Sequence, residues 1–279
     1  MISVVIPSLG GDLSETLNSL NSGTVKPDEI IICLPNKDHS VKDLSIYKNT
    51  VVVYSEKYGQ VYQRIFGFKK SKYEYILQLD DDVYVDKYCL EVLESIISST
   101  KDVSISPLWY DLTDESPLAK KKKVGVLMSF YYWMINGSMG YAPGKISLAG
   151  TNFGVHPNYV DENSNLFEVE WQPGGCIMHR RENILLEDYY PYSGKAYSED
   201  LIHSHLLKKQ TSSIRLAVLG SFVLFMGWGK ARWFSSFVVV VIKAIVHVHA
   251  LNLISYLLQF LLYGLCLSLY RRCEMLNLR

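Results

Sequence analysis

Three consecutive aspartates are the feature of this sequence that most clearly indicates chemistry. Asp80, Asp81 and Asp82 directly follow Tyr75–Leu79, an apolar run with the composition of a buried strand. Carboxylates this close repel and raise one another's pKa, and a divalent cation removes the conflict. Mg²⁺ or Mn²⁺ prefers hard oxygen ligands, often one or two carboxylates plus substrate phosphates. The sequence therefore predicts a divalent cation at Asp82 with Asp80 nearby; an acidic surface turn is the alternative.

The elements expected to position these aspartates alternate between strands and helices. Short apolar runs predict strands and apolar residues at helical spacing predict helices; the strands are Ile2–Ile6, Glu29–Leu34, Thr50–Tyr54 and Tyr75–Leu79, and the helices Leu13–Leu20 and Gly59–Lys70. This order predicts an α/β fold with a mostly parallel sheet and crossover helices. Ligands bind such sheets at the carboxyl ends of the strands, where Pro7–Gly11 and Asp80–Asp82 both fall.

Charge and cysteine usage exclude several classes of protein. Lys plus Arg and Asp plus Glu both number 28 in 279 residues, and a net charge of zero argues against a general nucleic-acid binder. The five cysteines are scattered, which is typical of reduced thiols rather than a disulfide framework. The short apolar start lacks a basic region, so we expect no signal peptide. The run Lys120–Lys123 is interpreted as a solvated loop rather than a functional basic patch.

The C-terminal region differs in composition from the rest of the chain. Residues 212–279 carry seven basic residues and one acidic residue, or +6, whereas residues 1–211 carry 21 and 27, or −6. Within the basic part, the twenty residues Ala250–Leu269 are long enough to span a bilayer, and Arg271 and Arg272 follow. An amphipathic hairpin in the membrane interface is the alternative. We therefore expect a body of residues 1–215 and a membrane-associating helical region of residues 216–279, at the cytoplasmic face of the membrane.

Four motifs together resemble the family 2 glycosyltransferases, which have the GT-A fold. Ser3–Ser8 looks like the first strand and nucleotide loop of that family, and Gly59–Gly67 like its G-x-x-x-A-R-N-x-G helix, with Arg64 kept but not the Ala and Asn. Leu79–Asp82 is similar to the D-x-D motif that binds metal and sugar nucleotide. Glu199-Asp200 is similar to the E-D motif that carries the catalytic base. The likeness covers roughly residues 1–215.

The resemblance implies a donor site built from these motifs. It places Pro7, Ser8, Arg64, Asp80 and Asp81 on the nucleotide-sugar, with a UDP-sugar favoured, and Asp82 and Asp80 on the metal. The family usually has Asp-Asp-Gly-Ser after the second strand, where an Asp contacts the base. This chain has Leu34–Asp38 there, so Asn36 or Asp38 is the candidate for that contact.

The resemblance also implies an inverting mechanism with one general base. A metal stabilises the diphosphate leaving group, and an acceptor hydroxyl needs a positioned base, for which Asp200 is the first candidate and Glu199 the second. The acceptor is expected to be a saccharide or a lipid-linked saccharide of surface polysaccharide synthesis. Gly174 and Gly175 fit the acceptor-side loop, and Trp171 either stacks on an acceptor ring or belongs to the core.

Two other functions compete with glycosyl transfer. A non-catalytic binding or scaffold protein of the GT-A fold remains the alternative, although retention of Asp80, Asp82 and Asp200 together favours an enzyme. A nucleotidylyltransferase would need a basic phosphate-gripping loop near the N-terminus, and Ser8–Leu13 has none.

Overall fold

A computed structural model describes residues 1–113, 115–119, 125–159, 166–190, 196, 198–210 and 213–225. Its strands are β1 Ile2–Pro7, β2 Glu29–Leu34, β3 Thr50–Tyr54, β4 Tyr75–Leu79, β5 Val83–Val85, β6 Val103–Asp111, β7 Leu166–Val169, β8 Cys176–Arg180 and β9 Ser213–Phe225. Its α-helices are α1 Ser14–Ser22, α2 Gln60–Lys70, α3 Cys89–Ser99, α4 Val126–Asn136 and α5 Glu199–Gln210. The α/β fold expected from the sequence is confirmed, with each predicted strand and helix within a few residues of its expected bounds.

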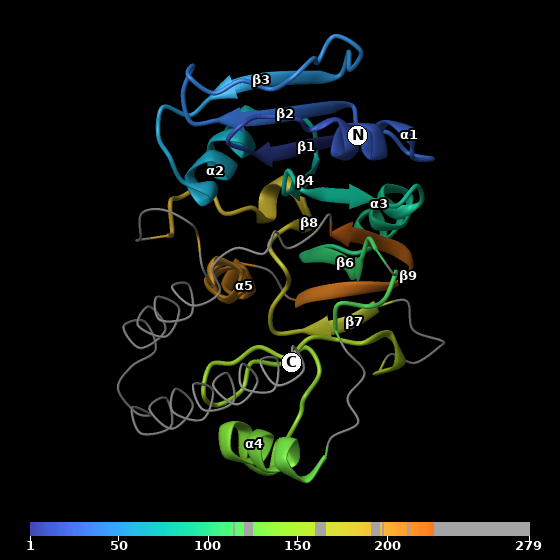
Figure 1. The fold of residues 1–279 in the computed structure, drawn as a ribbon, viewed down its shortest axis with the longest axis vertical. Helices are drawn as coiled ribbons and strands as arrows, with labels where there is room; N and C mark the ends of the chain where they lie inside the picture. The colour runs from blue at the N-terminus through green and yellow to red at the C-terminus, as the bar shows by residue number, and fades with distance from the viewer. Residues whose placement is uncertain are drawn as a thin grey trace, which may run out of the picture. The chain divides into compact units, whose positions relative to one another are not determined.

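The described strands form one nine-stranded sheet in the order β3-β2-β1-β4-β8-β6-β9-β5, with β7 paired to β9 (Figure 1). Strands β1 to β4 pair in parallel, as the alternation of strands and helices predicts. Strand β8 enters between β4 and β6 and is antiparallel to both. The carboxyl ends of β1, β2 and β4 therefore share one edge of the sheet, where the loops after them meet.

Apolar residues on alternate positions of the strands build the core on both faces of the sheet. Ile2, Val4 and Ile6 of β1 are fully buried in one cluster with apolar side chains of α1 and α3. Val5 faces the other way, into a cluster with Phe68 of α2. Side chains alternate between the two faces of β1. Because helices cover both faces of a sheet of this kind, neither face of β1 is exposed to solvent.

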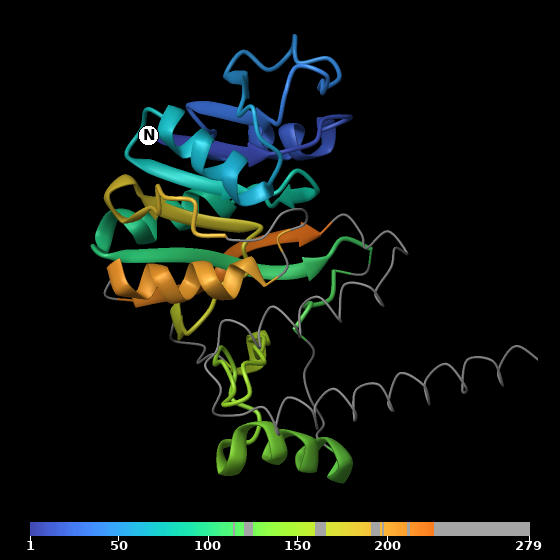
Figure 2. The same cartoon turned by 90° about the vertical axis from the view of Figure 1, so that its left-hand side faces the viewer.

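Helices α2 and α5 lie on the same side of the sheet (Figure 2). Val61 and Ile65 of α2 form a small apolar cluster with Tyr190, Ala196 and Ile202, the last from α5. Val61 and Ile65 are one helical turn apart, so they share the face of α2 that contacts Ile202. This packing fixes the start of α5 beside the N-terminal half of α2. This contact matters because both helices carry residues of the candidate site.

The chain divides into two compact units. One contains residues 1–121 and 154–229, and so the whole described sheet; the other contains residues 122–153 and 230–279. In the described part of the second unit, Tyr132 and Ile135 of α4 pack with Ala149 and Phe153 in an aromatic-rich cluster. The two units are described separately below.

Strand β9 carries residues 216–225 of the expected C-terminal region into the sheet, where it pairs with β5, β6 and β7. The apolar run Ala250–Leu269 lies outside the described residues, so the membrane-associating helical region stays a prediction. Among the residues that the structure describes, none of the helices has the length and apolar character needed to cross a membrane.

Candidate active site

The loop after β1 holds the second aspartate of the acidic run. The Ser8 hydroxyl donates a hydrogen bond to Asp81 Oδ2 at 2.5 Å and accepts one from the Gly10 N–H at 2.9 Å. Gly10 has φ +91°, and a Cβ there would collide with the Ser40 carbonyl, so this turn requires glycine. Burial raises the pKa of Asp81, the Ser8 hydrogen bond opposes that effect, and the Asp80 charge adds to it. Asp81 therefore ties the β4 end to the β1 loop.

Asp80 is held by two side chains of helix α2. Its Oδ1 accepts hydrogen bonds from Gln60 Nε2 at 2.9 Å and from Arg64 Nη2 at 3.2 Å. Gln60 and Arg64 are four residues apart, so they lie on the same face of the helix. The backbone N–H of Asp80 donates to the Gly175 carbonyl at 2.9 Å. Asp80 is thus fixed from α2 and from the segment that leads into β8.

Arg64 joins the two acidic motifs. Its guanidinium is 1% exposed and also donates from Nη1 to Glu199 Oε1 at 2.7 Å. Burial lowers the pKa of Arg64, but the negative charges of Glu199 and Asp80 outweigh that effect and raise it. A buried arginine shared by two carboxylates is expensive to assemble, because each ion loses its hydration. The contact places the Asp80 run and the Glu199-Asp200 pair in one site.

Both oxygens of Glu199 are engaged. Oε1 accepts from Arg64, and Oε2 accepts from the Tyr189 hydroxyl at 3.0 Å. The carboxylate is 5% exposed and lies in the first turn of α5, where an acidic residue is favoured by the helix dipole. Burial and the neighbouring Glu199 charge raise the pKa of Tyr189 well above its usual value, which keeps this phenol a hydrogen-bond donor.

Asp200 has a different environment from its neighbour. It is half-buried, and its Oδ1 accepts a hydrogen bond from the Leu201 N–H at 3.1 Å. Burial, with the adjacent Glu199 charge in second place, raises the pKa of Asp200 to about 7. A carboxylate with a pKa near neutrality is matched to proton abstraction at physiological pH. Of the two acidic residues, Asp200 has the properties of a base and Glu199 those of a fixed counter-ion.

Gly174 and Gly175 allow these groups to approach the backbone closely. A Cβ at Gly174 would lie 2.5 Å from Glu199 Oε1, and a Cβ at Gly175 would lie 2.6 Å from Trp109 Cη2 and 3.0 Å from Asp80 Oδ2. Gln78 also donates a short hydrogen bond to the Gly174 carbonyl. Any larger residue would push the carboxylates apart, which gives this glycine pair a steric role at the junction of both acidic motifs.

The aspartates fit a cation only as a partial set of ligands. Asp82 is exposed, Asp80 is half-buried, and both are at the carboxyl end of β4. Within the described ranges, no group of three or more His, Cys, Asp or Glu side chains converges on a point that would hold a metal ion. Two carboxylates with hard oxygens fit Mg²⁺ or Mn²⁺ when substrate phosphates complete the coordination.

The loop after β2 brings Asn36 to an aromatic side chain. Asn36 Oδ1 accepts from the Asp38 N–H at 3.0 Å and contacts His39 Nδ1 at 2.8 Å, and its Nδ2 lies 3.4 Å from the Tyr58 hydroxyl. The His39 and Tyr58 rings meet edge to face at 5.4 Å. Asp38 itself is exposed. Pro7, at the end of β1, is buried and pairs with Cys33.

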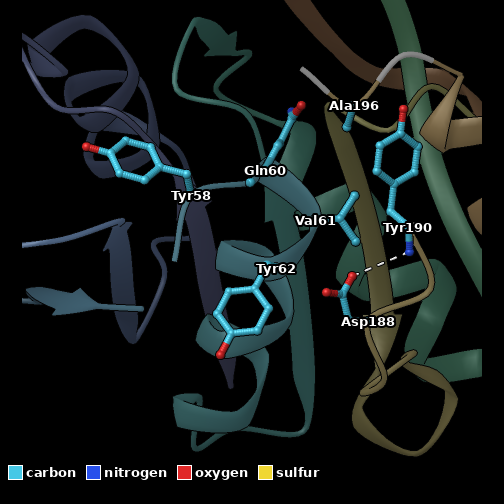
Figure 3. A pocket seen from close by; sticks show the side chains of 8 residues that line it. Tyr58, Gln60, Val61, Tyr62, Asp188, Tyr190 and Ala196 are labelled. Atoms are coloured by element: carbon cyan, nitrogen blue, oxygen red, sulfur yellow. Dashed lines mark hydrogen bonds between the residues drawn. The ribbon is translucent and has the colours of Figure 1, made fainter. Parts of the chain in front are cut away.

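A shallow pocket opens at the start of α2, lined by Tyr58, Gly59, Gln60, Val61, Tyr62, Asp188, Tyr190 and Ala196 (Figure 3). Gln60 belongs both to this pocket and to the hydrogen bonds of Asp80. On the opposite wall, the Tyr190 N–H lies 3.4 Å from Asp188 Oδ1. The Gln60 side chain therefore links the lining of the pocket to the acidic site.

Sequence reasoning missed several residues that support the site. Gln63 donates to the Ser8 and Cys33 carbonyls at 2.8 and 2.6 Å, and so fixes the β1 loop on α2. Spacing could have found Gln60, which is one helical turn before Arg64. No motif or spacing in the sequence indicated Tyr189. His203 is buried beside His179, and burial followed by the Arg64 charge lowers its pKa to about 3. Trp171 is half-buried, and both of its readings stay open.

Comparison with solved structures identifies proteins of similar fold. The chain resembles a crystal structure of GalNAc-T7 with UDP, GalNAc and Mn²⁺, with 17% identity and a TM-score of 0.56 over 82% of this chain and 44% of that one. It also resembles S. aureus TarS, with 15% identity and a TM-score of 0.50 over 88% and 39%. The chain thus spans less than half the length of these two proteins, and the likeness shows a shared GT-A fold.

The comparisons at the level of sequence give one match. Comparison with curated protein sequences found no similar protein. The sequence model of glycosyl transferase family 2 matches residues 3–154, which is more than half of the 279 residues and includes the β1 loop, the α2 motif and the aspartate run. The chain therefore belongs to glycosyl transferase family 2.

Proposed function

We propose that this protein is an inverting glycosyltransferase that moves a sugar from a UDP-sugar to a hydroxyl of a saccharide or lipid-linked acceptor. The observation that carries the proposal is the Arg64 bridge, which holds Asp80 and Glu199 through contacts of 3.2 and 2.7 Å. This bridge joins the carboxylate run after β4 to the Glu199-Asp200 pair, and that proximity supports a donor side and an acceptor-side base within one site. The presence of UDP and Mn²⁺ in the GalNAc-T7 crystal structure supports the donor and metal classes.

On the donor side, the chain supplies fixed carboxylates and a glycine turn. Asp80 is held by Gln60 and Arg64, and Asp81 by Ser8, so this edge needs little reorganisation when a nucleotide-sugar binds. Asp82 and Asp80 would hold Mg²⁺ or Mn²⁺. That cation would supply electrostatic stabilisation of the developing charge on the diphosphate leaving group. Asn36, with Tyr58 and His39 beside it, is our candidate for contact with the nucleobase of the donor.

On the acceptor side, Asp200 takes the proton from the attacking hydroxyl. Its pKa of about 7 keeps it largely ionised above neutral pH while leaving it basic enough to accept that proton. Glu199 is occupied by Arg64 and Tyr189, so it positions the start of α5 and raises the basicity of its neighbour. In an inverting displacement one base opposite the leaving group suffices, and no covalent nucleophile is required.

The charge distribution supports work at a membrane surface. The +6 charge of residues 212–279 and the apolar run Ala250–Leu269 suit contact with anionic lipid, which would bring the site to a lipid-linked acceptor of surface polysaccharide synthesis. We place the protein at the cytoplasmic face, where nucleotide-sugars are available and the arginines after the apolar run are retained.

A donor screen tests this function. Purified protein is incubated with Mn²⁺ and a panel of nucleotide-sugars, with and without saccharide and lipid-linked acceptors, and nucleotide release is measured. We expect release from a UDP-sugar that is stimulated by acceptor and lost on chelation. Binding of nucleotide-sugars with no release in any combination would favour the non-catalytic GT-A-fold scaffold instead.

A further inference from the structure

The side-chain amide of Asn36 has its orientation fixed by the backbone. The Asp38 N–H, which can only donate, lies 3.0 Å from Asn36 Oδ1, so this atom must be the acceptor oxygen of the amide. His39 Nδ1 lies 2.8 Å from the same oxygen and therefore carries a proton that it donates. These two contacts engage the oxygen of the amide, so the NH₂ group is what Asn36 offers to a ligand.

Tyr58 adds an aromatic ring beside this amide. Its hydroxyl lies 3.4 Å from Asn36 Nδ2, and its ring meets the His39 ring edge to face at 5.4 Å. Tyr58 is nonetheless 65% exposed, and Figure 3 shows its ring pointing away from Tyr190 and Ala196 across the pocket. Aromatic side chains of this kind stack on nucleobases. The loop after β2 and the start of α2 thus present a hydrogen-bond donor and a ring together.

The amide and the ring belong to the same edge of the sheet as the aspartate run. Tyr58 is two residues before Gln60, which donates to Asp80. The Ser8 N–H donates to the Cys33 carbonyl at 3.1 Å, so the β1 loop is held beside the end of β2. The loops after β1 and β2 are therefore neighbours at the edge where ligands bind sheets of this kind. One nucleotide can extend from the aspartates to the loop after β2.

We propose that Asn36 selects the nucleobase of the donor by donating a hydrogen bond to a ring carbonyl, while the base stacks on Tyr58. This inference rests on the proposed function and names the groups that choose its nucleotide. Aspartate, which the family usually has after the second strand, can only accept and would read a ring N–H instead. Uracil has ring carbonyls and adenine has none, so this arrangement favours uridine nucleotides over adenosine nucleotides.

Equilibrium binding of UDP, ADP and uridine to the full chain tests this assignment. Uridine carries no phosphate, so it separates hydrogen bonding to the base from repulsion between a new charge and the diphosphate. We compare wild type with Asn36→Asp, which keeps the oxygen that accepts from Asp38 but removes the donor, and with Tyr58→Ala and Tyr58→Phe. The matched controls are Asn18→Asp in α1 and Tyr88→Ala at the start of α3, both at exposed positions. The melting temperature of every variant is measured as a check of folding.

We expect wild type to bind UDP roughly tenfold or more tightly than ADP, because adenine leaves the amide donor without an acceptor. Asn36→Asp should lose roughly tenfold or more in affinity for UDP and for uridine alike, since a carboxylate would face the ring carbonyl. Tyr58→Ala should lose roughly fivefold to a hundredfold, whereas Tyr58→Phe keeps the ring and should keep most of the affinity. Both controls should bind as wild type does.

Other results would overturn the proposal. Unchanged affinity in Asn36→Asp would mean that this side chain only shapes the turn after β2, and a higher affinity would mean that it accepts from a ring N–H. Unchanged affinity in Tyr58→Ala would remove the stacking, and equal binding of UDP and ADP would remove the selection. All of these outcomes leave glycosyl transfer standing. Failure of wild type to bind any nucleotide would contradict the proposed function as well.

Discussion

Replacing Asp200 by asparagine separates catalysis from stability at this site. The amide keeps the size of the side chain and an oxygen that accepts from the Leu201 N–H, but it cannot accept a proton. We expect turnover to fall by the ~10²–10⁴-fold that loss of a general base costs, with UDP-sugar affinity nearly unchanged. Donor binding by calorimetry and turnover are measured on the same preparation.

The same substitution should stabilise the folded protein at neutral and higher pH. The pKa of Asp200 rises from 3.8 to about 7 on folding, so between these values the native state holds a proton that the unfolded chain has lost. The wild-type free energy of unfolding therefore falls as pH rises through this window. At about 1.4 kcal/mol per unit the full shift corresponds to at most about 4 kcal/mol. Partial solvent exposure of Asp200 reduces this, and we expect about 1–2 kcal/mol.

Chemical unfolding of wild type and Asp200→Asn between pH 4 and pH 8 measures this effect. The difference should be small near pH 4, where the native carboxyl is protonated and the unfolded one is only about half ionised, and largest at pH 8. The control is Glu187→Gln, an exposed carboxylate, which should change neither turnover nor the pH dependence. If Asp200→Asn loses about 1 kcal/mol at all pH values and keeps its turnover, the residue only caps α5 and the base lies elsewhere.

Three further substitutions test the rest of the site. Arg64→Met leaves Asp80 and the buried Glu199 without their shared cation, so the free energy of unfolding should fall by about 3–5 kcal/mol in a denaturant titration. Lys42→Met, which breaks an exposed pair with Asp12 at 3.6 Å, should leave the free energy of unfolding nearly unchanged in the same titration. Asp82→Ala should abolish transfer and weaken UDP-sugar binding in calorimetry, as chelation should for wild type, and full activity in excess EDTA would refute the metal role. Gly67→Ala would drive a methyl group into Val5 and Cys33, so we expect a loss of about 1–3 kcal/mol. Gly125→Ala meets open space at the N-cap of α4, where alanine is only a poorer cap, and should lower the melting temperature less than Gly67→Ala does.

Local patterns were sufficient to predict the strands and helices around the donor site. A short apolar run bounded by turn residues is too short for a typical helix and indicates a buried strand, and β1 to β4 coincide with the runs that predicted them. The ligand edge followed from the same reasoning, because parallel strands present their carboxyl ends together. The aspartate run and Ser8 were therefore expected at one edge, and the structure joins them through the contact of Ser8 with Asp81.

Only the tertiary structure decided how the two acidic motifs are combined. Arg64 and Glu199 are 135 residues apart in the chain, and no local periodicity records a contact of that separation. It depends on β8 entering antiparallel between β4 and β6, which brings Gly174 and Gly175 under the carboxylates, and on α5 packing beside α2. The sequence alone determined which residue types were available for the chemistry. The division of labour between Glu199 and Asp200 came from burial and hydrogen bonding, since two adjacent carboxylates differ only in what the folded chain places around them.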